Sequence, residues 1–163
     1  MTGLLSSLEA SVPALRSYAA MLLADRREAD ELVRACLVAA LNRPQARSQA
    51  VLRVWLLGLV HQGGLSRLRR KGIRWQPASP GMPQGDQETG AQTVIGSTET
   101  MAAFAKLPVE LRSVLFLVSV EELSYAEAAE VLGVAVETVM SLLSEGRRRL
   151  RALEVPPVAR RLA

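Results

Sequence analysis

The chain has 163 residues, of which 49% are hydrophobic and only 4% aromatic, and this favours a helical protein of one medium or two small domains. Its longest uncharged apolar run, Val54 to Val60, is too short to span a bilayer, and the first residues lack the pattern of a signal peptide. The single cysteine, Cys36, excludes an internal disulfide and fits a cytoplasmic protein, while the formal charge of +4 only weakly indicates nucleic acid as a partner.

Residues 1–71 predict three helices, each marked by apolar residues at helical spacing. We expect the first helix to begin near Pro13, which suits the first turn of a helix, with Ser11 as its N-cap. The third contains the pair Gly63-Gly64. Glycine is unfavourable inside a helix, so this pair predicts a kink or an end there.

Basic residues crowd the far end of the third helix, and an aromatic residue follows them. The cluster consists of Arg67, Arg69, Arg70 and Lys71, with Arg74 and Trp75 a few residues on. Such a helix end can bind a phosphate backbone, and Trp75 can stack on an unpaired base. The cations also suit a solvated helix C-terminus, where they interact favourably with the helix dipole. The sequence leaves both interpretations open.

Residues 72–97 differ in composition from the rest of the chain. They contain five Gly and three Pro in 26 residues, which are unfavourable in helices and strands. We therefore expect a linker here, between a first domain at 1–71 and a second at 98–153. Residues 154–163 are expected to form a short tail.

The second domain contains a stretch, Leu123 to Leu150, that has the form of a helix-turn-helix. Ser124 and Glu127 form the S-x-x-E pattern of a capping box, which satisfies free N–H groups at a helix start. Gly133 suits the left-handed residue that ends a helix with little strain. Apolar residues then recur at helical spacing, at Val136, Val139, Met140 and Leu143. In DNA-binding proteins of this form, the second helix lies in the major groove.

The charges of this stretch agree only in part with DNA binding. Its second helix, Ala135 to Gly146, contains no Lys or Arg but does contain Glu137 and Glu145, although Lys and Arg supply most of the non-specific affinity for DNA. Thr138 and Ser141 are the candidates for base contacts. The candidates for phosphate contacts are the arginines that follow, Arg147, Arg148, Arg149 and Arg151. The sequence leaves open whether this helix reads bases.

The chain shows no catalytic or metal-binding pattern. His61 has no second His, Cys or acidic partner at ligand spacing, and Cys36 lies on an apolar stripe, so both are interpreted as structural. The sequence contains no glycine-rich phosphate loop, nucleophile elbow or pair of catalytic carboxylates. We therefore expect no enzyme activity, no cofactor, no metal ion and no small-molecule substrate.

From Ala103 to Leu153 the chain resembles region 4 of the extracytoplasmic-function (ECF) sigma factors, the initiation subunits of bacterial RNA polymerase. The resemblance rests on Leu107-Pro108, Arg112, the L-S-Y-x-E-x-A core, Leu132-Gly133-Val134, Thr138 to Ser141 and the closing Arg-rich stretch. Upstream, AMLLADRREADELVRACLVAAL is similar to region 2, and VWLLGLVHQGGLSRLRRKGIR is similar to the helix that follows it. The resemblance covers nearly the whole chain.

This resemblance implies an all-α fold of two small helical domains, a region 2 bundle and a region 4 helix-turn-helix, joined by a flexible linker. The implied partners are core RNA polymerase, promoter DNA and an anti-sigma factor that holds the protein inactive. Docking on polymerase is implied for Asp30, Glu31, Leu32 and Arg34. Promoter melting is implied for the basic cluster with Trp75, and contact with upstream DNA for region 4. The sigma subunit itself carries out no catalysis.

Several positions depart from the family pattern. A glutamine of the docking face is Arg34 here, two arginines of the recognition helix are Leu142 and Glu145, and a glycine is Glu137. These changes motivate a second hypothesis, a degenerate sigma-like protein with little or no DNA binding. Such a protein would act by sequestering an anti-sigma factor or by damping a true sigma factor. An ordinary helix-turn-helix repressor is a weaker alternative, because it leaves the first three helices unexplained.

Overall fold

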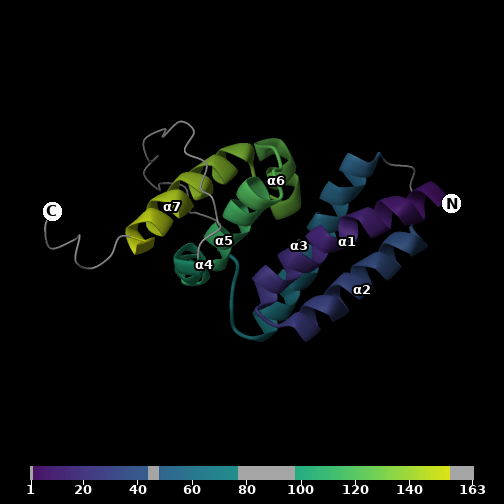
Figure 1. Ribbon diagram of the computed structural model, residues 1–163, viewed down its shortest axis with the longest axis horizontal. Coiled ribbons are helices and arrows are strands. Elements are labelled where there is room, and N and C mark those ends of the chain that lie inside the picture. The colour runs from purple at the N-terminus through teal and green to yellow at the C-terminus, as the bar shows by residue number, and fades with distance from the viewer. Residues whose placement is uncertain (1, 44–47, 77–97, 155–163) are drawn as a thin grey trace, which may run out of the picture.

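The computed structural model describes residues 2–43, 48–76 and 98–154. The helices are α1 (Thr2–Leu23), α2 (Arg26–Asn42), α3 (Gln49–Arg70), α4 (Thr98–Ala105), α5 (Val109–Leu115), the π-helical η1 (Phe116–Val120), α6 (Tyr125–Leu132) and α7 (Val136–Glu154). No strand occurs within the described ranges, and the all-α prediction is confirmed. Figure 1 shows two groups, α1 to α3 and α4 to α7, lying against each other.

Helices α1, α2 and α3 form the first group by packing on one another. Asp25 caps the start of α2, because its Oδ1 accepts hydrogen bonds from the backbone N–H groups of Arg27 at 2.8 Å and Glu28 at 3.2 Å. Ser48 caps α3 in the same way, accepting from the N–H of Val51 at 3.4 Å. These short polar side chains supply acceptors for N–H groups that the helix itself leaves free.

Helix α3 runs through Gly63 and Gly64, so of the predicted kink or end at this pair the end is wrong. An added Cβ would lie 2.5 Å from a methyl carbon of Leu32 at Gly63, and 2.9 Å from one of Leu22 at Gly64. The absence of side chains at these two positions therefore makes room for leucines of α2 and α1. Tertiary packing outweighs the low helix propensity of glycine here.

Helix α1 begins at Thr2, and the prediction that it begins near Pro13 is wrong, because the proline lies inside the helix. Ser11 does not act as a cap. Its Oγ donates a hydrogen bond to the carbonyl of Ser7, one turn earlier, at 2.9 Å. Leu8 and Leu15, on either side of the proline, are both buried in the core. We attribute the continuity of α1 to this packing, which offsets the lost backbone hydrogen bond.

The second group is built around α7, which packs on α4, α5 and α6. Helix α5 continues directly into η1, and the chain then turns at Glu122, whose φ of 56° is left-handed. At Gly146 of α7, an added Cβ would lie 3.1 Å from two side-chain carbons of Leu115. The small residue lets α7 approach α5 closely.

The two groups share one continuous core, in which α3 lies against α6 and α1 against α5. The approach of α3 to α6 is close at Gly58, where an added Cβ would lie 4.0 Å from the Cα of Val131. Arg112 of α5 reaches across to α1, donating from Nη1 to the carbonyl of Met21 at 3.2 Å. The second group is therefore held against the first bundle through α5 and α6.

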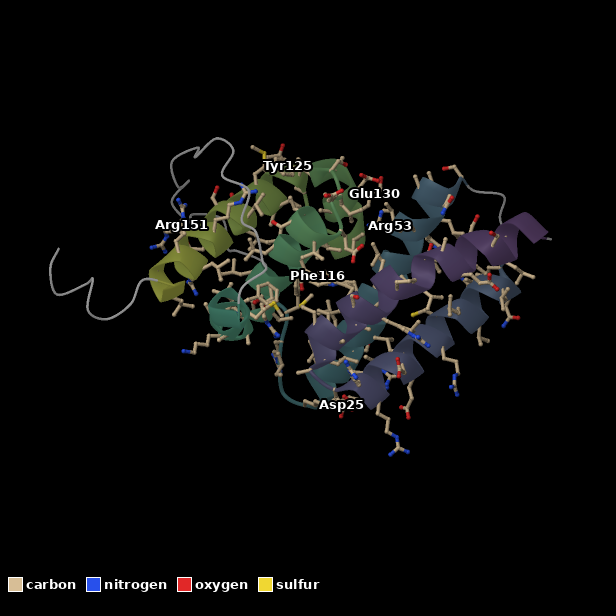
Figure 2. The ribbon with its side chains drawn as sticks, in the orientation of Figure 1. Asp25, Arg53, Phe116, Tyr125, Glu130 and Arg151 are labelled. Carbon is tan, nitrogen blue, oxygen red and sulfur yellow. The ribbon has the colours of Figure 1, made fainter. Side chains whose placement is uncertain are left out.

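An ion pair also joins the two helical groups. Nη2 of Arg53, on α3, donates at 2.7 Å to both the carbonyl and the carboxylate of Glu121, which follows η1. The side chain of Glu121 is only 10% exposed. Arg53 projects from α3 toward the second group (Figure 2). The sequence analysis missed this pair, because 68 residues separate its members and neither belongs to a local pattern.

Residues 77–97, most of the expected linker, and residues 155–163, most of the expected tail, lie outside the described residues. The first residues after α3 contact both groups. The backbone N–H of Gln76 donates to Oε1 of Glu110, on α5, at 2.6 Å. The ring of Trp75 meets that of His61 edge-on, with centroids 4.8 Å apart.

Replacing Gly58 with leucine is expected to force α3 away from α6 and to cost about 1–3 kcal/mol, the usual range for overpacking a close contact. Small-angle X-ray scattering should then give a larger radius of gyration than for the wild type. Gly58→Ala is the matched control, because a contact at 4.0 Å is ordinary and needs no displacement. Identical radii and stabilities for the two variants would contradict close packing at this site.

Candidate nucleic-acid interface

The helix-turn-helix has the geometry that its sequence predicts. Oγ of Ser124 accepts from the N–H of Glu127 at 3.1 Å, and Oε1 of Glu127 accepts from the N–H of Ser124 at 3.0 Å. Gly133 ends α6 in the left-handed conformation, with φ 67° and ψ 35°. The capping box and the glycine turn are both confirmed, and they mark the start and the end of α6.

Helix α7 buries one face and exposes the other. Val139, Leu143 and Leu150 are fully buried on the inner face. Thr138 and Ser141, the candidates for base contacts, are partly exposed near the start of the helix. In a helix-turn-helix these early residues are the ones that meet base edges. Both residues are therefore partly accessible near the start of α7, and their contact with bases stays a prediction.

Leu142 stands where the family pattern has an arginine, yet it lies on the inner face and is only 2% exposed. Met140, two residues earlier, is 43% exposed. Because this position is buried, having leucine in place of arginine does not change the charge of the outer face of α7. We therefore expect it to affect DNA binding less than the sequence suggested. Of the two positions where the family pattern has arginine, only position 145, with Glu145, changes the charge on the outer surface of α7.

Glu145 is engaged by two of the predicted phosphate-binding arginines. Its carboxylate accepts from Nε of Arg148 at 3.0 Å, from Nη2 of Arg148 at 2.6 Å and from Nε of Arg149 at 2.7 Å. The hydrogen bonds from Arg148 are the main reason that the pKa of Glu145 is lowered. The spacing of Glu145 from Arg148 and Arg149 in the sequence already indicates these ion pairs, since residues three and four apart share a helix face.

The other two arginines of the group differ in exposure. Arg147 is half-buried, and its Nε has no hydrogen-bond partner among the described residues. Arg151 is exposed on the last turns of α7 (Figure 2), and its Nε donates to the carbonyl of Arg147 at 3.4 Å. The four predicted residues therefore do not form one uniform cationic surface.

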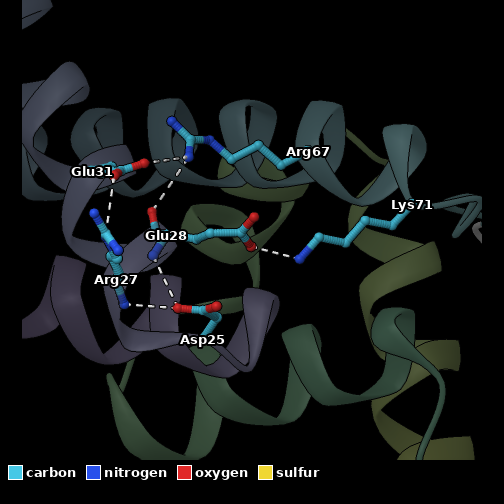
Figure 3. A network of polar contacts seen from close by, with 6 residues as sticks. All are labelled: Asp25, Arg27, Glu28, Glu31, Arg67 and Lys71. Atoms are coloured by element: carbon cyan, nitrogen blue, oxygen red, sulfur yellow. Dashed lines mark hydrogen bonds and ion pairs between the residues drawn. The ribbon is translucent and has the colours of Figure 1, made fainter.

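The basic cluster at the end of α3 is partly neutralised by acidic residues of α2, as Figure 3 shows. Nζ of Lys71 lies 2.6 Å from the carboxylate of Glu28. Nη1 of Arg67 lies 3.9 Å from the carboxylate of Glu31, which also lies 4.0 Å from Nε of Arg27. These acids sit in the first two turns of α2 and the cations in the last turns of α3, an arrangement that both helix dipoles favour.

Two further cations of the cluster, Arg69 and Arg70, are exposed, and neither forms an ion pair within the described part of the chain. Trp75 is only partly exposed, because its ring packs on His61 and the core. Stacking of Trp75 on a base stays a prediction, and it would require the ring to leave this contact. Arg69 and Arg70, at the helix end, are therefore available to phosphate.

The residues predicted to dock on polymerase divide into an exposed set and a buried one. Asp30, Glu31 and Arg34 are exposed on α2, and the carboxylate of Asp30 lies 3.7 Å from Nε of Arg16. Leu32 is 3% exposed and packs in the core against α3. The prediction that Leu32 makes a docking contact is therefore wrong for this structure, because its apolar side chain faces the bundle interior.

His61 and Tyr18 form a buried pair that the sequence analysis did not detect. The hydroxyl of Tyr18 lies 2.7 Å from Nδ1 of His61, and the ring of Phe116 packs beside Tyr18 with centroids 5.8 Å apart. Burial lowers the pKa of His61 to about 4 and raises that of Tyr18. The structural interpretation of His61 agrees with this position, and no local signal in the sequence identifies its partner.

None of the helices in the described ranges is long and apolar enough to cross a membrane. Within the same ranges, no group of three His, Cys, Asp or Glu side chains is placed to hold a metal ion.

Comparison with known proteins identifies the family. Residues 97–150 match the family model described as Sigma-70, region 4, and residues 8–61 match the one described as the Sigma2 domain of PhyR. The chain is 32% identical over 146 residues to the ECF RNA polymerase sigma factor EcfG of Rhodopseudomonas palustris, which covers 88% of this chain and 81% of that protein. The chain belongs to the ECF RNA polymerase sigma factors. The resemblance inferred from its motifs is thereby confirmed.

A second relative of this sigma factor is the ECF RNA polymerase sigma factor SigM of Mycobacterium tuberculosis. It is 34% identical over 125 residues, which make up 76% of this chain and 62% of SigM. The fold matches that of the sigma factor RpoE from Bartonella quintana, solved in complex with the anti-sigma factor NepR. The TM-score is 0.69 at 22% identity, over 94% of this chain and 97% of that one. Both helical groups are therefore typical of ECF sigma factors.

Proposed function

We propose that this sigma factor directs core RNA polymerase to promoters, with residues 1–71 docking on polymerase and residues 98–153 contacting upstream DNA. The observation that carries the proposal is the order of parts. A region 4 match coincides with a well-formed helix-turn-helix, and the sigma2 match precedes it on the bundle of α1 to α3. The protein acts in the cytoplasm, where bacterial polymerase works, and it contributes binding rather than catalysis.

The exposed residues define a role for each surface. On α7, Thr138 and Ser141 contact bases while the arginines after them contact phosphates. At the end of α3, Arg69 and Arg70 contact the phosphate backbone of the melted segment. On α2, Asp30, Glu31 and Arg34 form the polar part of the polymerase contact. An anti-sigma factor is a further partner, supported by the complex in which the RpoE fold was solved.

Transcription in vitro with core polymerase and a broad promoter library tests the proposal. We expect the purified protein to co-elute with core polymerase and to start transcription at a defined subset of promoters. The double variant Arg69→Ala, Arg70→Ala should still co-elute but should lose most of its initiation, because it removes two exposed cations that form no ion pair with the acids of α2 within the described part of the chain. Failure to initiate at any promoter would contradict the proposal.

A second candidate function is favoured by the ion pairs of Glu145, which occupy two of the arginines that DNA binding requires. In this alternative the protein keeps the sigma fold but binds an anti-sigma factor or competes with a true sigma factor. A gel-shift titration of the full chain with duplex DNA at low salt separates the two functions. Binding that weakens steeply with salt supports the sigma subunit, and no binding supports the mimic.

A further inference from the structure

Glu145 and its two arginines form a compact cluster on the exposed side of α7. Three hydrogen bonds of 2.6–3.0 Å join the carboxylate to Arg148 and Arg149. The side chain of Glu145 is 18% exposed, whereas those of Arg148 and Arg149 are 68% and 44% exposed. The acid therefore lies beneath the two guanidinium groups, and their outer surfaces face solvent.

The geometry of the cluster follows from helix spacing. Residues three and four positions apart lie on one face of a helix, and an acid on the N-terminal side of the cation gives the more favourable pair. Arg148 presents Nε and Nη2 to the two carboxylate oxygens as a fork, which is the stronger form of this contact. The same fork is the one that arginine offers to a phosphate group.

We propose that Glu145 is a positioning residue that competes with DNA phosphate for Arg148 and Arg149, and thereby sets how strongly the protein binds DNA of any sequence. The inference rests on the proposed function of α7 as the DNA-contacting helix. One formal negative charge stands against two positive charges, so the cluster presents a net charge of +1 in place of +2. Release of either arginine to a phosphate leaves the carboxylate less well paired.

The consequence is a lower affinity for non-specific DNA. Each phosphate neutralised by Lys or Arg contributes a salt-dependence slope of about 0.9 in log K against log salt. An arginine held by Glu145 contributes less than this, whereas the base contacts of Thr138 and Ser141 depend on salt much less. Glu145 therefore improves the ratio of specific to non-specific binding.

The test compares Glu145→Gln with Glu137→Gln in the full chain. Glu137 is an exposed acid on the same helix, and no ion pair to it occurs within the described residues, so its replacement removes the same formal charge without releasing an arginine. Binding to a duplex of random sequence is measured from 50 to 200 mM salt. For Glu145→Gln we expect roughly tenfold tighter binding and a slope steeper by about one to two units. Equal effects of the two substitutions would overturn the inference.

A double-mutant cycle gives an independent readout. Arg148→Ala should weaken duplex binding more in the Glu145→Gln background than in the wild type, because the arginine is released only in that background. Additive effects of the two substitutions count against the inference.

Retention on a heparin column separates failure of this inference from failure of the proposed function, since it reports the release of cations without requiring promoter DNA. If Glu145→Gln elutes later than Glu137→Gln, the competition by Glu145 is supported. This holds even if no variant binds duplex DNA, because the absence of duplex binding would contradict only the proposed function. Elution of the two variants at the same salt concentration would overturn the inference about Glu145 itself.

Discussion

Lowering the pH from 6.5 to 4 is expected to remove about 3 kcal/mol of the free energy of unfolding through His61 alone. The side chain is 1% exposed, and burial lowers its pKa from 6.5 to about 4. The folded protein therefore holds His61 neutral at pH values where the unfolded chain protonates it. The contribution of His61 to the free energy of unfolding is fully present above pH 6.5 and is lost as the pH falls toward 4.

The surroundings of His61 offer little compensation for a charge. Its Nδ1 meets the hydroxyl of Tyr18, its ring meets that of Trp75, and its Nε2 has no hydrogen-bond partner among the described residues. Tyr18 also lines the contact between the two helical groups, because its ring packs on that of Phe116. Protonation is therefore expected to weaken the contact between the groups along with the first bundle.

Denaturant unfolding of the wild type and of His61→Gln at pH 7, 5.5 and 4 measures this effect. Both proteins lose stability as their carboxylates titrate, so the difference between them isolates His61. We expect that difference to shift by about 3 kcal/mol in favour of the variant between pH 7 and pH 4. Parallel pH dependences for the two proteins would show that His61 is not held neutral by the fold.

Restoring the arginine of the family pattern at Leu142 is expected to destabilise the protein by about 3 kcal/mol, and not to improve DNA binding. Leu142 is 2% exposed on α7, the helix that packs on α4, α5 and α6. An arginine there loses the buried apolar contact and has to move its charge out of the core. We expect a lower midpoint of thermal unfolding and exposed apolar surface in the second group.

Met140→Arg is the matched control for Leu142→Arg. It adds the same charge to the same helix at a position that is 43% exposed. Its effect on stability should lie within about 0.5 kcal/mol, and it should tighten binding to DNA because it adds a cation to the outer face. Equal stabilities of the two variants would mean that Leu142 is not part of the core.

The features that sequence reasoning identified correctly depend on short stretches of chain. The capping box of Ser124 and Glu127 and the left-handed Gly133 act within one or two helical turns, so their residue types suffice to locate the two ends of α6. The order of such motifs also identified the family. The predicted base-contacting residues, Thr138 and Ser141, are partly exposed on α7, and their contact with bases stays a prediction.

The errors arose where contacts between distant segments outweigh local propensity. Gly63 and Gly64 suggested a helix end, but they make room for leucines of neighbouring helices. Pro13 suggested a helix start, but α1 continues past it because residues before and after the proline pack in the core. Leu32 was assigned to a docking surface, although it faces the core.

By itself, the sequence determined that this protein is all-helical, that it ends in a helix-turn-helix and that it belongs with the ECF sigma factors, because caps, turns and apolar periodicity are local. Only the tertiary structure decided that the two helical groups share a core, with Arg53 paired to Glu121 and Tyr18 to His61. Those contacts join residues 68 and 43 positions apart. They arise from the packing of α1 and α3 against the second group, and no pattern within a single helix encodes them.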